Sequence, residues 1–551
     1  MDIDNAMRPS RRAAVAKIGA VVVGNMVVPF RANARERPSS AADVRLKSVV
    51  AVEDYYEDKD QGDWLAAFQR ASNATHQRGG GVIYLDLPRY ILGRYTGADV
   101  AENVLGHHLD ANSISRIWIL PSNVLVISKN SSIIDLVGGE SCPFGYQTSI
   151  NVLSGVFDGE KTVEVTGVSV DENKISFKVM PNICVGQTIR LARNGRSVNS
   201  TPSREDAPNQ FLTIKSVDEN SITVDQGLRQ LFKSAEDLVL RFRDGQRDYP
   251  KNIRLENLHF TSTGGTAYIC HSATINSGWK NITLDRGVSA SWGTSNGVKS
   301  DQVTLISDAI KKNTLTIEST SDVDWGSLML EGNGSSNSLG GLLVGDASTN
   351  VHFKRIEARD FQRAGISVLF GGDTEIDYLA VENCATSTPA KNAYSAAVSI
   401  GFPAAGAGPS SSISESVSSK YKMRNTGATT VHIRKLSITG PTSVPVRVHD
   451  AELKIDEGYI EFLDQGAHSP FLVGQSGLSR SDAKFFPLGG VTGLRLGKIR
   501  IVSIGKPALS LMEKNAVGSK FSADVVVKAK LGRVTIDGQI VNPLQPSMKM
   551  Q

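Results

Sequence analysis

The spacing of apolar residues changes abruptly between residues 63 and 92. At first, inward-facing positions recur every three or four residues, as on one face of an α-helix: Trp64, Phe68, Ala71 and Thr75. Three glycines at 79–81 follow, and glycine is unfavourable inside a helix. Beyond them apolar residues alternate with others over 82–87 and again over 90–92, on either side of Pro88. The stretch therefore predicts an amphipathic helix, a glycine stop and a strand.

Short strands of one form recur through the middle of the chain. Five segments place apolar residues two apart after a polar first residue: Asn252-Ile-Arg-Leu, Asn281-Ile-Thr-Leu, Asn350-Val-His-Phe, Glu375-Ile-Asp-Tyr and Thr430-Val-His-Ile. The first residues are 29, 69, 25 and 55 positions apart, which predicts one, about three, one and about two turns of a solenoid. Stacked coils would bury two rows. One row would contain Ile253, Ile282, Val351, Ile376 and Val431, and the other Leu255, Leu284, Phe353, Tyr378 and Ile433.

The helix and strand at 63–92 resemble the entry segment of the pectate lyase-like right-handed parallel β-helix proteins (pectin lyase fold), with their "GGG-V-Y-L-P" and "Y-x-I". Residues 117–137, with "LPSNVLVISKNSSIIDL", resemble the second coil of that superfamily. The resemblance is to its tailspike and glycoside hydrolase-like branch. It implies an all-β, right-handed parallel β-helix (solenoid) with an N-terminal amphipathic capping helix, and a polysaccharide as the partner. Hydrolases, lyases, epimerases and binding proteins share this scaffold, so the fold alone does not select an activity.

A different pattern interrupts the solenoid. The sequence "SVDEN" occurs at 169–173 and at 216–220, each time between alternating strands, and Asp-Glu-Asn favours a turn. We expect hairpins there, within an inserted small β subdomain, and another hairpin across 303–317 with its turn at 311–313. The expected division is 1–34 signal peptide, 35–157 N-terminal cap and first coils, 158–247 inserted subdomain, 248–540 main parallel β-helix with loop insertions, and 541–551 flexible tail.

The first 34 residues have the features of an export signal. Arg11 and Arg12 precede an apolar stretch at 18–30, and Ala32-Asn33-Ala34 is the small-x-small pattern that a signal peptidase accepts. We therefore expect a twin-arginine-type signal peptide and a periplasmic or secreted protein. The apolar stretch is shorter than the ~20 residues of a membrane-spanning helix, so no integral membrane span is expected.

Composition narrows the classes of partner. The 551 residues carry a formal net charge of +4 and only 6% aromatic residues. Without residues 1–34, 55 basic residues (60 − 5) face 54 acidic residues (56 − 2), so no nucleic-acid partner is expected. Four cysteines lack metal-binding spacing and are expected to be buried free thiols: Cys142, Cys184, Cys270 and Cys384. The oligomeric state stays open, and tailspike-like relatives include trimers.

Paired carboxylates are the first candidates for chemistry. Asp346 and Asp373 precede two successive strands, which predicts that both lie at one corner of neighbouring coils. Two carboxylates suit glycoside hydrolysis, although aspartates in glycine-rich corners also cap turns. His352 and Asp377 are expected at equivalent outward positions on adjacent strands, with His432 farther along, as an acid, a base or a subsite row. The alternative for that row is a solvated sheet face.

Basic residues in one coil suit lyase chemistry instead: Lys354, Arg355, Arg359 and Arg363. They would neutralise a uronate while His352 acts as the base. Trp292, like Trp279 and Trp325, is a candidate for stacking on a sugar ring or else for packing. No cofactor is expected for a hydrolase, and calcium only for a lyase. The sequence thus predicts an exported polysaccharide-degrading hydrolase, with a uronate lyase and a non-catalytic glycan-binding surface solenoid as alternatives.

Overall fold

The computed structural model describes residues 48–93, 117–137, 149–155, 160–193, 209–229, 232, 235, 238–243, 248–263, 266–307, 313–334, 340–345, 348–369, 372–386, 396–401, 429–442, 444–449, 451–462, 471–473, 493–503, 509–511, 525–529, 534–536 and 539–541. Four parts of the chain with expectations attached lie outside these ranges: residues 1–34, residues 542–551, Cys142 and Asp346. The expectations for them remain predictions. No helix in the described ranges is long and apolar enough to cross a membrane.

The predicted helix, glycine stop and strand are confirmed. Helix α2 (Leu65–Gln77) buries Phe68, Ala71 and Thr75, and Trp64 is partly buried against them. The Phe68 ring packs edge-on against the indole of Trp118, with ring centroids 4.8 Å apart. Two short 3-10 helices, η1 (Val52–Tyr55) and η2 (Asp58–Asp60), precede α2. The helix therefore covers the open end of the first coil, where the interior would otherwise meet water.

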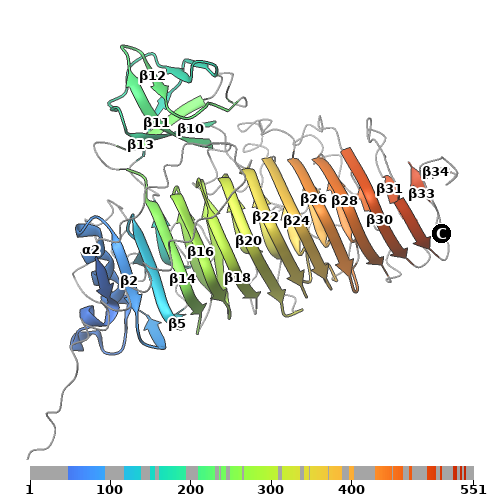
Figure 1. The fold of residues 1–551 in the computed structure, drawn as a ribbon, viewed down its shortest axis with the longest axis horizontal. Helices are drawn as coiled ribbons and strands as arrows, with labels where there is room; N and C mark the ends of the chain where they lie inside the picture. Colours follow the sequence, from blue (N-terminus) through green and yellow to red (C-terminus); the bar gives the residue numbers. More distant parts are fainter. Residues whose placement is uncertain are drawn as a thin grey trace, which may run out of the picture.

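Two parallel sheets run the length of the molecule (Figure 1). Sheet 1 has 14 strands: β1 (Val49–Ala51), β2 (Gly81–Leu85), β3 (Arg89–Leu92), β5 (Val124–Leu136), β14 (Lys251–Thr261), β16 (Ile275–Leu284), β18 (Lys299–Ser307), β20 (Ser321–Gly332), β22 (Ser348–Arg359), β24 (Gly372–Glu382), β26 (Thr429–Thr439), β28 (Ala451–Phe462), β30 (Gly493–Ser503) and β32 (Val525–Ala529). Sheet 2 has 13 strands: β4 (Trp118–Ile119), β6 (Ser149–Gly155), β15 (Ala267–Ser272), β17 (Val288–Gly293), β19 (Asn313–Glu318), β21 (Gly340–Gly345), β23 (Ile366–Val368), β25 (Val398–Gly401), β27 (Val446–His449), β29 (Phe471–Val473), β31 (Leu509–Leu511), β33 (Val534–Ile536) and β34 (Gln539–Val541).

From β3 to β33, apart from the residues between β6 and β14, successive strands alternate between the two sheets. Each pairs in parallel with a strand of a neighbouring coil, except the terminal β33 and β34, which are antiparallel to each other. This topology is a parallel β-helix, as the resemblance implied. Apolar side chains of both sheets point inward and form one continuous buried core from Val50 to Ile499. Each coil depends on its neighbours for burial, because a single coil cannot enclose its own apolar face.

Long strands of sheet 1 bend where two consecutive residues face outward. Asn257 and Asn281 occupy this bend in β14 and β16, with φ values of 55° and 52° that asparagine tolerates better than most residues. The Asn281 Nδ2 atom donates to Asn257 Oδ1 over 2.9 Å. Asn252 lies instead at the start of β14, where its Nδ2 donates to Asn123 Oδ1 over 2.7 Å. The prediction that Asn252 and Asn281 occupy equivalent positions was therefore wrong, because Asn281 is equivalent to Asn257.

The predicted aliphatic rows are wrong in register. Ile282 pairs with Leu258 rather than with Ile253. Ile376 pairs with Phe353, whereas the prediction placed it beside Val351. The alternating pattern was correct, but the register of β22 and β24 shifts at an irregularity near Val351 that alternation cannot reveal.

This register shift also moves Tyr378. It lies at the outward bend beside Arg355 and Lys435, not in an interior row. The 55-residue separation before Thr430 spans one coil rather than two, because β24 pairs directly with β26. The extra length belongs to the segment between β25 and β26, which the ranges above exclude beyond Gly401.

Tryptophan rings fill the middle of the solenoid. Trp279, Trp292 and Trp325 are at most 1% exposed, and the Trp292 ring lies 4.5 Å from that of Trp279. His271 stacks on Trp292 with centroids 4.7 Å apart. Desolvation lowers the pKa of His271 to about 3, so the ring is neutral near pH 7.

The cysteine prediction holds for two of the three described residues. Cys270 and Cys384 are buried free thiols, and burial raises the pKa of Cys384 to about 12. Cys184 is also a free thiol but is exposed, so the expectation of burial is wrong there. It lies in the insertion, where the chain packs around a smaller core than the solenoid has.

The insertion forms a seven-stranded antiparallel sheet that projects from the side of the solenoid (Figure 1). Its strands are β7 (Glu160–Glu164), β8 (Gly167–Ser169), β9 (Lys174–Ser176), β10 (Thr188–Arg193), β11 (Asn209–Val217), β12 (Ser221–Val224) and β13 (Leu238–Arg243). Both "SVDEN" sequences lie at hairpins, β8–β9 and β11–β12, as predicted. The hairpin expected across 303–317 is wrong, because β18 and β19 belong to different parallel sheets.

Polar contacts fix the insertion against the coils. Asn209 Nδ2 donates to the Ser319 carbonyl oxygen over 2.6 Å, and Arg229 forms an ion pair with Asp322 at 3.4 Å and donates to Thr349. Phe211 packs edge-on against Tyr249, with ring centroids 5.0 Å apart. The insertion thereby lies over the amino ends of β20 and β22.

Candidate functional site

Two polar rows cross the outward face of sheet 1. The first polar row contains residues that pair level with one another on successive strands: Lys299, Asp324, His352, Glu375, His432 and Lys454. The second polar row lies two residues further along each strand: Asp301, Gly326, Lys354, Asp377, Arg434 and Asp456. Parallel strands lie about 4.8 Å apart, so side chains in neighbouring coils are within contact distance.

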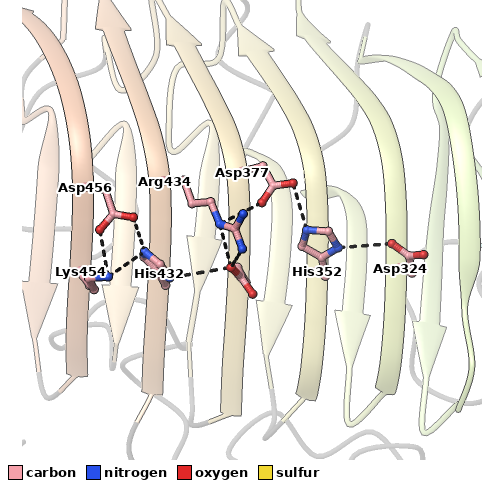
Figure 2. A network of polar contacts seen from close by, with 8 residues as sticks. Asp324, His352, Asp377, His432, Arg434, Lys454 and Asp456 are labelled. Atoms are coloured by element: carbon pink, nitrogen blue, oxygen red, sulfur yellow. Dashed lines mark hydrogen bonds and ion pairs between the residues drawn. The ribbon is translucent and has the colours of Figure 1, made fainter. Parts of the chain in front are cut away.

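His352 lies between two carboxylates (Figure 2). Its Nδ1 atom is 3.3 Å from Asp324 Oδ1, and its Nε2 atom is 3.2 Å from Asp377 Oδ2. Neutral imidazole has one N–H group, so both contacts are hydrogen bonds only when the ring is protonated. A proton on His352 can therefore be shared with a carboxylate on either neighbouring strand.

Arg434 joins Glu375 and Asp377, two of the acidic residues of β24. Its Nη2 and Nε atoms lie 2.6 and 3.0 Å from Glu375 Oε1, and its Nε atom lies 3.3 Å from Asp377 Oδ1. The hydrogen bond to Glu375 and the charge of both carboxylates raise the pKa of Arg434. The guanidinium thus stabilises two like charges on one strand.

His432 continues the network to β28. Its Nε2 atom lies 2.7 Å from Asp456 Oδ2 and 3.3 Å from Lys454 Nζ, and Lys454 Nζ lies 2.9 Å from Asp456 Oδ1. Partial burial alone would raise the pKa of Asp456, but the hydrogen bonds from Lys454 and His432 outweigh it and the pKa is lowered. Asp456 is therefore a fixed anion of this network near neutral pH.

The structure brings His352 and Asp377 together, as predicted, but through a different register. His352 is level with Glu375, and Asp377 lies one row further along. Asp324 was missed although the alternation of Val323 and Trp325 places it outward between two buried residues. Arg434 and Asp456 were missed because their role depends on which strands are neighbours.

Asp373 has a structural partner. Its Oδ2 atom accepts a hydrogen bond from the backbone N–H of Asn350 over 2.8 Å, on the neighbouring coil. This is the turn-capping role that was the alternative to catalysis. The other half of the leading pair, Asp346, lies outside the described residues.

The predicted basic cluster is dispersed along β22 and the turn after it. Lys354 is exposed in the second polar row, and Arg355 lies at the bend, 4.6 Å from the centre of the Tyr378 ring. Arg359 forms an ion pair with Glu331 at 2.7 Å, and Arg363 lies beyond the end of the strand. These residues do not converge on one ligand, because a strand carries successive side chains away from each other at about 3.3 Å per residue.

Trp292 requires a correction as a substrate-binding residue. It is fully buried, and its Nε1 atom donates to Ser277 Oγ over 3.0 Å inside the solenoid. The ring cannot reach a sugar without opening the core. The described residues contain no group of three His, Cys, Asp or Glu side chains that could hold a metal ion.

No protein-family model matches this chain, and neither does any curated protein. Among solved structures, the tailspike gp61 of Pseudomonas phage phi297 is similar, with a TM-score of 0.44 and 12% identity over 90% of this chain and 76% of that chain. The A-module of the Azotobacter vinelandii mannuronan C-5 epimerase AlgE4 has a TM-score of 0.47 and 11% identity over 92% and 100% of the two chains. The surface adhesin PfbA of Streptococcus pneumoniae has a TM-score of 0.45 and 11% identity over 89% and 91%.

These similarities concern the fold. The chain has a parallel β-helix fold, as the strand topology shows. The solved structures similar to this chain are those of tailspikes, an epimerase, an exopolygalacturonase and an adhesin, among others. A fold does not define an activity, so any activity has to be argued from the side chains of this chain.

Proposed function

We propose that this protein binds a polysaccharide along the two polar rows and hydrolyses a glycosidic bond there. The observation that supports the proposal is the placement of His352 between Asp324 and Asp377, with Glu375 and Arg434 on the same face. Carboxyl pairs on one open face suit the acid and base roles of glycoside hydrolysis. The adjacent coils would provide subsites for a chain that runs along the solenoid axis.

The two carboxyl groups beside His352 have different partners, and we propose their roles from this difference. Asp377 is paired with Arg434 and is the less exposed, at 34% against 58% for Asp324. We assign Asp377 as the base that takes a proton from water, because a base must be ionised. Asp324 has His352 as its only ion-pair partner among the described residues, and we assign it as the acid that gives a proton to the leaving oxygen. His352 would hold both carboxyl groups in place.

A uronate lyase is less well supported by the same residues. A lyase needs positive charge that is available to the carboxylate of its substrate. Arg434 is paired with Glu375 at 2.6 Å, and Lys454 with Asp456 at 2.9 Å. Arg434 and Lys454 are already paired, so these two cations would neutralise a substrate carboxylate only weakly, which leaves exposed Lys354 as the cation beside His352.

The test is incubation of the purified protein with neutral and uronate-containing polysaccharides. New reducing ends without near-ultraviolet absorbance are expected, because hydrolysis leaves no conjugated double bond. Asp377→Asn should lower the rate at least about 100-fold. Asp373→Asn is the matched control, since its side chain can still accept the N–H group of Asn350.

Three results would contradict the proposal. Absorbance that rises with the reducing ends would indicate a lyase. Binding of a polymer without cleavage would indicate a glycan-binding solenoid. Equal activity in Asp377→Asn and Asp373→Asn would show that the polar rows are not the active site.

A further inference from the structure

A second charged region lies on the same outward face, on strands β14, β16 and β18. Here the first polar row extends to Arg254 and Gly278, and the second to Lys280. Arg254 lies across Gly278, and its Nη1 atom donates to the Lys299 carbonyl oxygen over 2.8 Å. A side chain at Gly278 would clash with both the guanidinium and that carbonyl group. The glycine therefore allows Arg254 to lie flat beside Lys280 and Lys299.

The cations of this region form no ion pair within the described structure, although Glu256 and Asp301 are level with Lys280 and Asp324 is level with Lys299 on the neighbouring strands. No carboxylate among the described residues lies within ion-pair distance of Arg254, Lys280 or Lys299, and the hydrogen bond to the Lys299 carbonyl occupies one of the five N–H donors of Arg254. Arg434, Arg359 and Lys454 on the same sheet each have a carboxylate partner.

Partial burial makes the charge of the Arg254 guanidinium unfavourable when no anion is bound beside it. Arg254 is half-buried, and desolvation lowers its pKa. Glu256 is the nearest acidic neighbour on β14 but forms no hydrogen bond or ion pair with it, and burial raises the pKa of Glu256 despite the charges of Lys280 and Arg254. A half-buried guanidinium with unused donors gains most from an oxyanion, which it can bind through two parallel hydrogen bonds.

We propose that Arg254, Lys280 and Lys299 form a subsite for an acidic substituent, such as a uronate carboxylate, of a glycan bound to the polar rows. This inference rests on the proposed function for the choice of a glycan. Lys299 lies two strands from His352, roughly 10 Å away at the usual strand spacing. One acidic chain along the axis would thus reach the subsite and the candidate catalytic residues together. The predicted substrate is an acidic polysaccharide.

The test measures binding rather than activity, by calorimetry at constant ionic strength. The probes are sodium sulfate, a uronate oligomer, and the same oligomer with its carboxyl groups reduced to alcohols. We expect sulfate and the uronate oligomer to bind wild type and the reduced oligomer to bind at least about tenfold more weakly. Arg254→Gln and Lys299→Gln should each weaken both anions about tenfold. Arg359→Gln is the matched control, because Arg359 lies outside the polar rows and is paired with Glu331, and it should leave sulfate binding unchanged.

The outcomes separate this inference from the proposed function. Sulfate binding that Arg254→Gln removes, in a protein that cleaves no polysaccharide, would support the subsite and refute the hydrolase. Equal binding by wild type, Arg254→Gln and Lys299→Gln would overturn the subsite, as would no preference for the uronate oligomer over its reduced form. Lys299 is exposed, so its variant keeps the test valid if Arg254→Gln fails to fold.

Discussion

Acid should destabilise this protein through His271. The ring is fully buried, accepts a hydrogen bond from Trp279 Nε1 over 2.9 Å at Nε2, and contacts Ser154 Oγ through Nδ1. Because Nε2 is the acceptor, Nδ1 carries the proton of the neutral ring and donates to Ser154. A second proton, on Nε2, would break the hydrogen bond from Trp279 and would place a positive charge where no water can solvate it.

The magnitude follows from the two pKa values. Desolvation lowers the pKa of His271 to about 3 in the folded protein, against about 6.5 in an unfolded chain. Between these values the unfolded chain binds the proton and the folded protein does not, so stability falls as the pH falls below about 6.5. The loss in the free energy of unfolding is roughly 2 kcal/mol between pH 7 and pH 5.

Equilibrium urea unfolding at pH 7 and at pH 5, followed by tryptophan fluorescence, measures this loss. His271→Gln removes the buried titration, so it should lose about 2 kcal/mol less than wild type over the same interval, whatever its stability at pH 7. His76→Gln removes an exposed histidine and is the control. The reasoning is refuted if His271→Gln shows the same pH dependence as wild type, or if both variants reduce it equally.

Other substitutions test the fold. Gly326→Ala should cost about 1–3 kcal/mol in thermal unfolding, because a Cβ atom would displace the Asp301 carboxylate that accepts the Ser327 N–H group; an unchanged melting temperature would contradict this. Glu160→Gln should destabilise the insertion by about 3–5 kcal/mol, because it removes the carboxylate charge that the buried Arg190 guanidinium contacts over 2.6 Å. Limited proteolysis should then cleave the insertion first, and equal resistance would count against the role of the pair. Trp292→Ala should cost about 3–5 kcal/mol by opening a cavity, whereas a loss of glycan binding at full stability would restore its role in recognition.

Local pattern was sufficient for most of the elements, although not for the hairpin expected across 303–317. The spacing of Phe68, Ala71 and Thr75 predicts α2, and the glycines after it predict the stop, because helix periodicity and backbone freedom are properties of a short segment. Both "SVDEN" turns were correct for the same reason. The prediction of a parallel β-helix came from the resemblance at 63–92, because these local rules alone do not specify how the strands are arranged in space.

The polar rows could be predicted only in part. Alternation identifies His352 and Asp377 as outward, since a strand places every second side chain on one face. Their partners depend on the pairing between coils, and the irregular register near Val351 changed that pairing by two residues. Asn252 and Asn257 both lie on β14, five residues apart, and each is followed by a buried residue. Comparison of short segments therefore could not show that Asn281 is level with Asn257 rather than with Asn252.

The amino-acid sequence alone thus established that this chain forms a capped solenoid with an antiparallel insertion, because the spacing of apolar residues in helices and strands is a property of the sequence itself. The folded arrangement decided which charges meet. Asp324, His352 and Asp377 come from three strands, and Arg254 forms no ion pair with Glu256 although the two residues are on one strand and their charges interact. The energy of an electrostatic contact depends on distance in space, and water and salt screen it over roughly 8 Å. It is therefore set by strand register and burial rather than by separation along the chain.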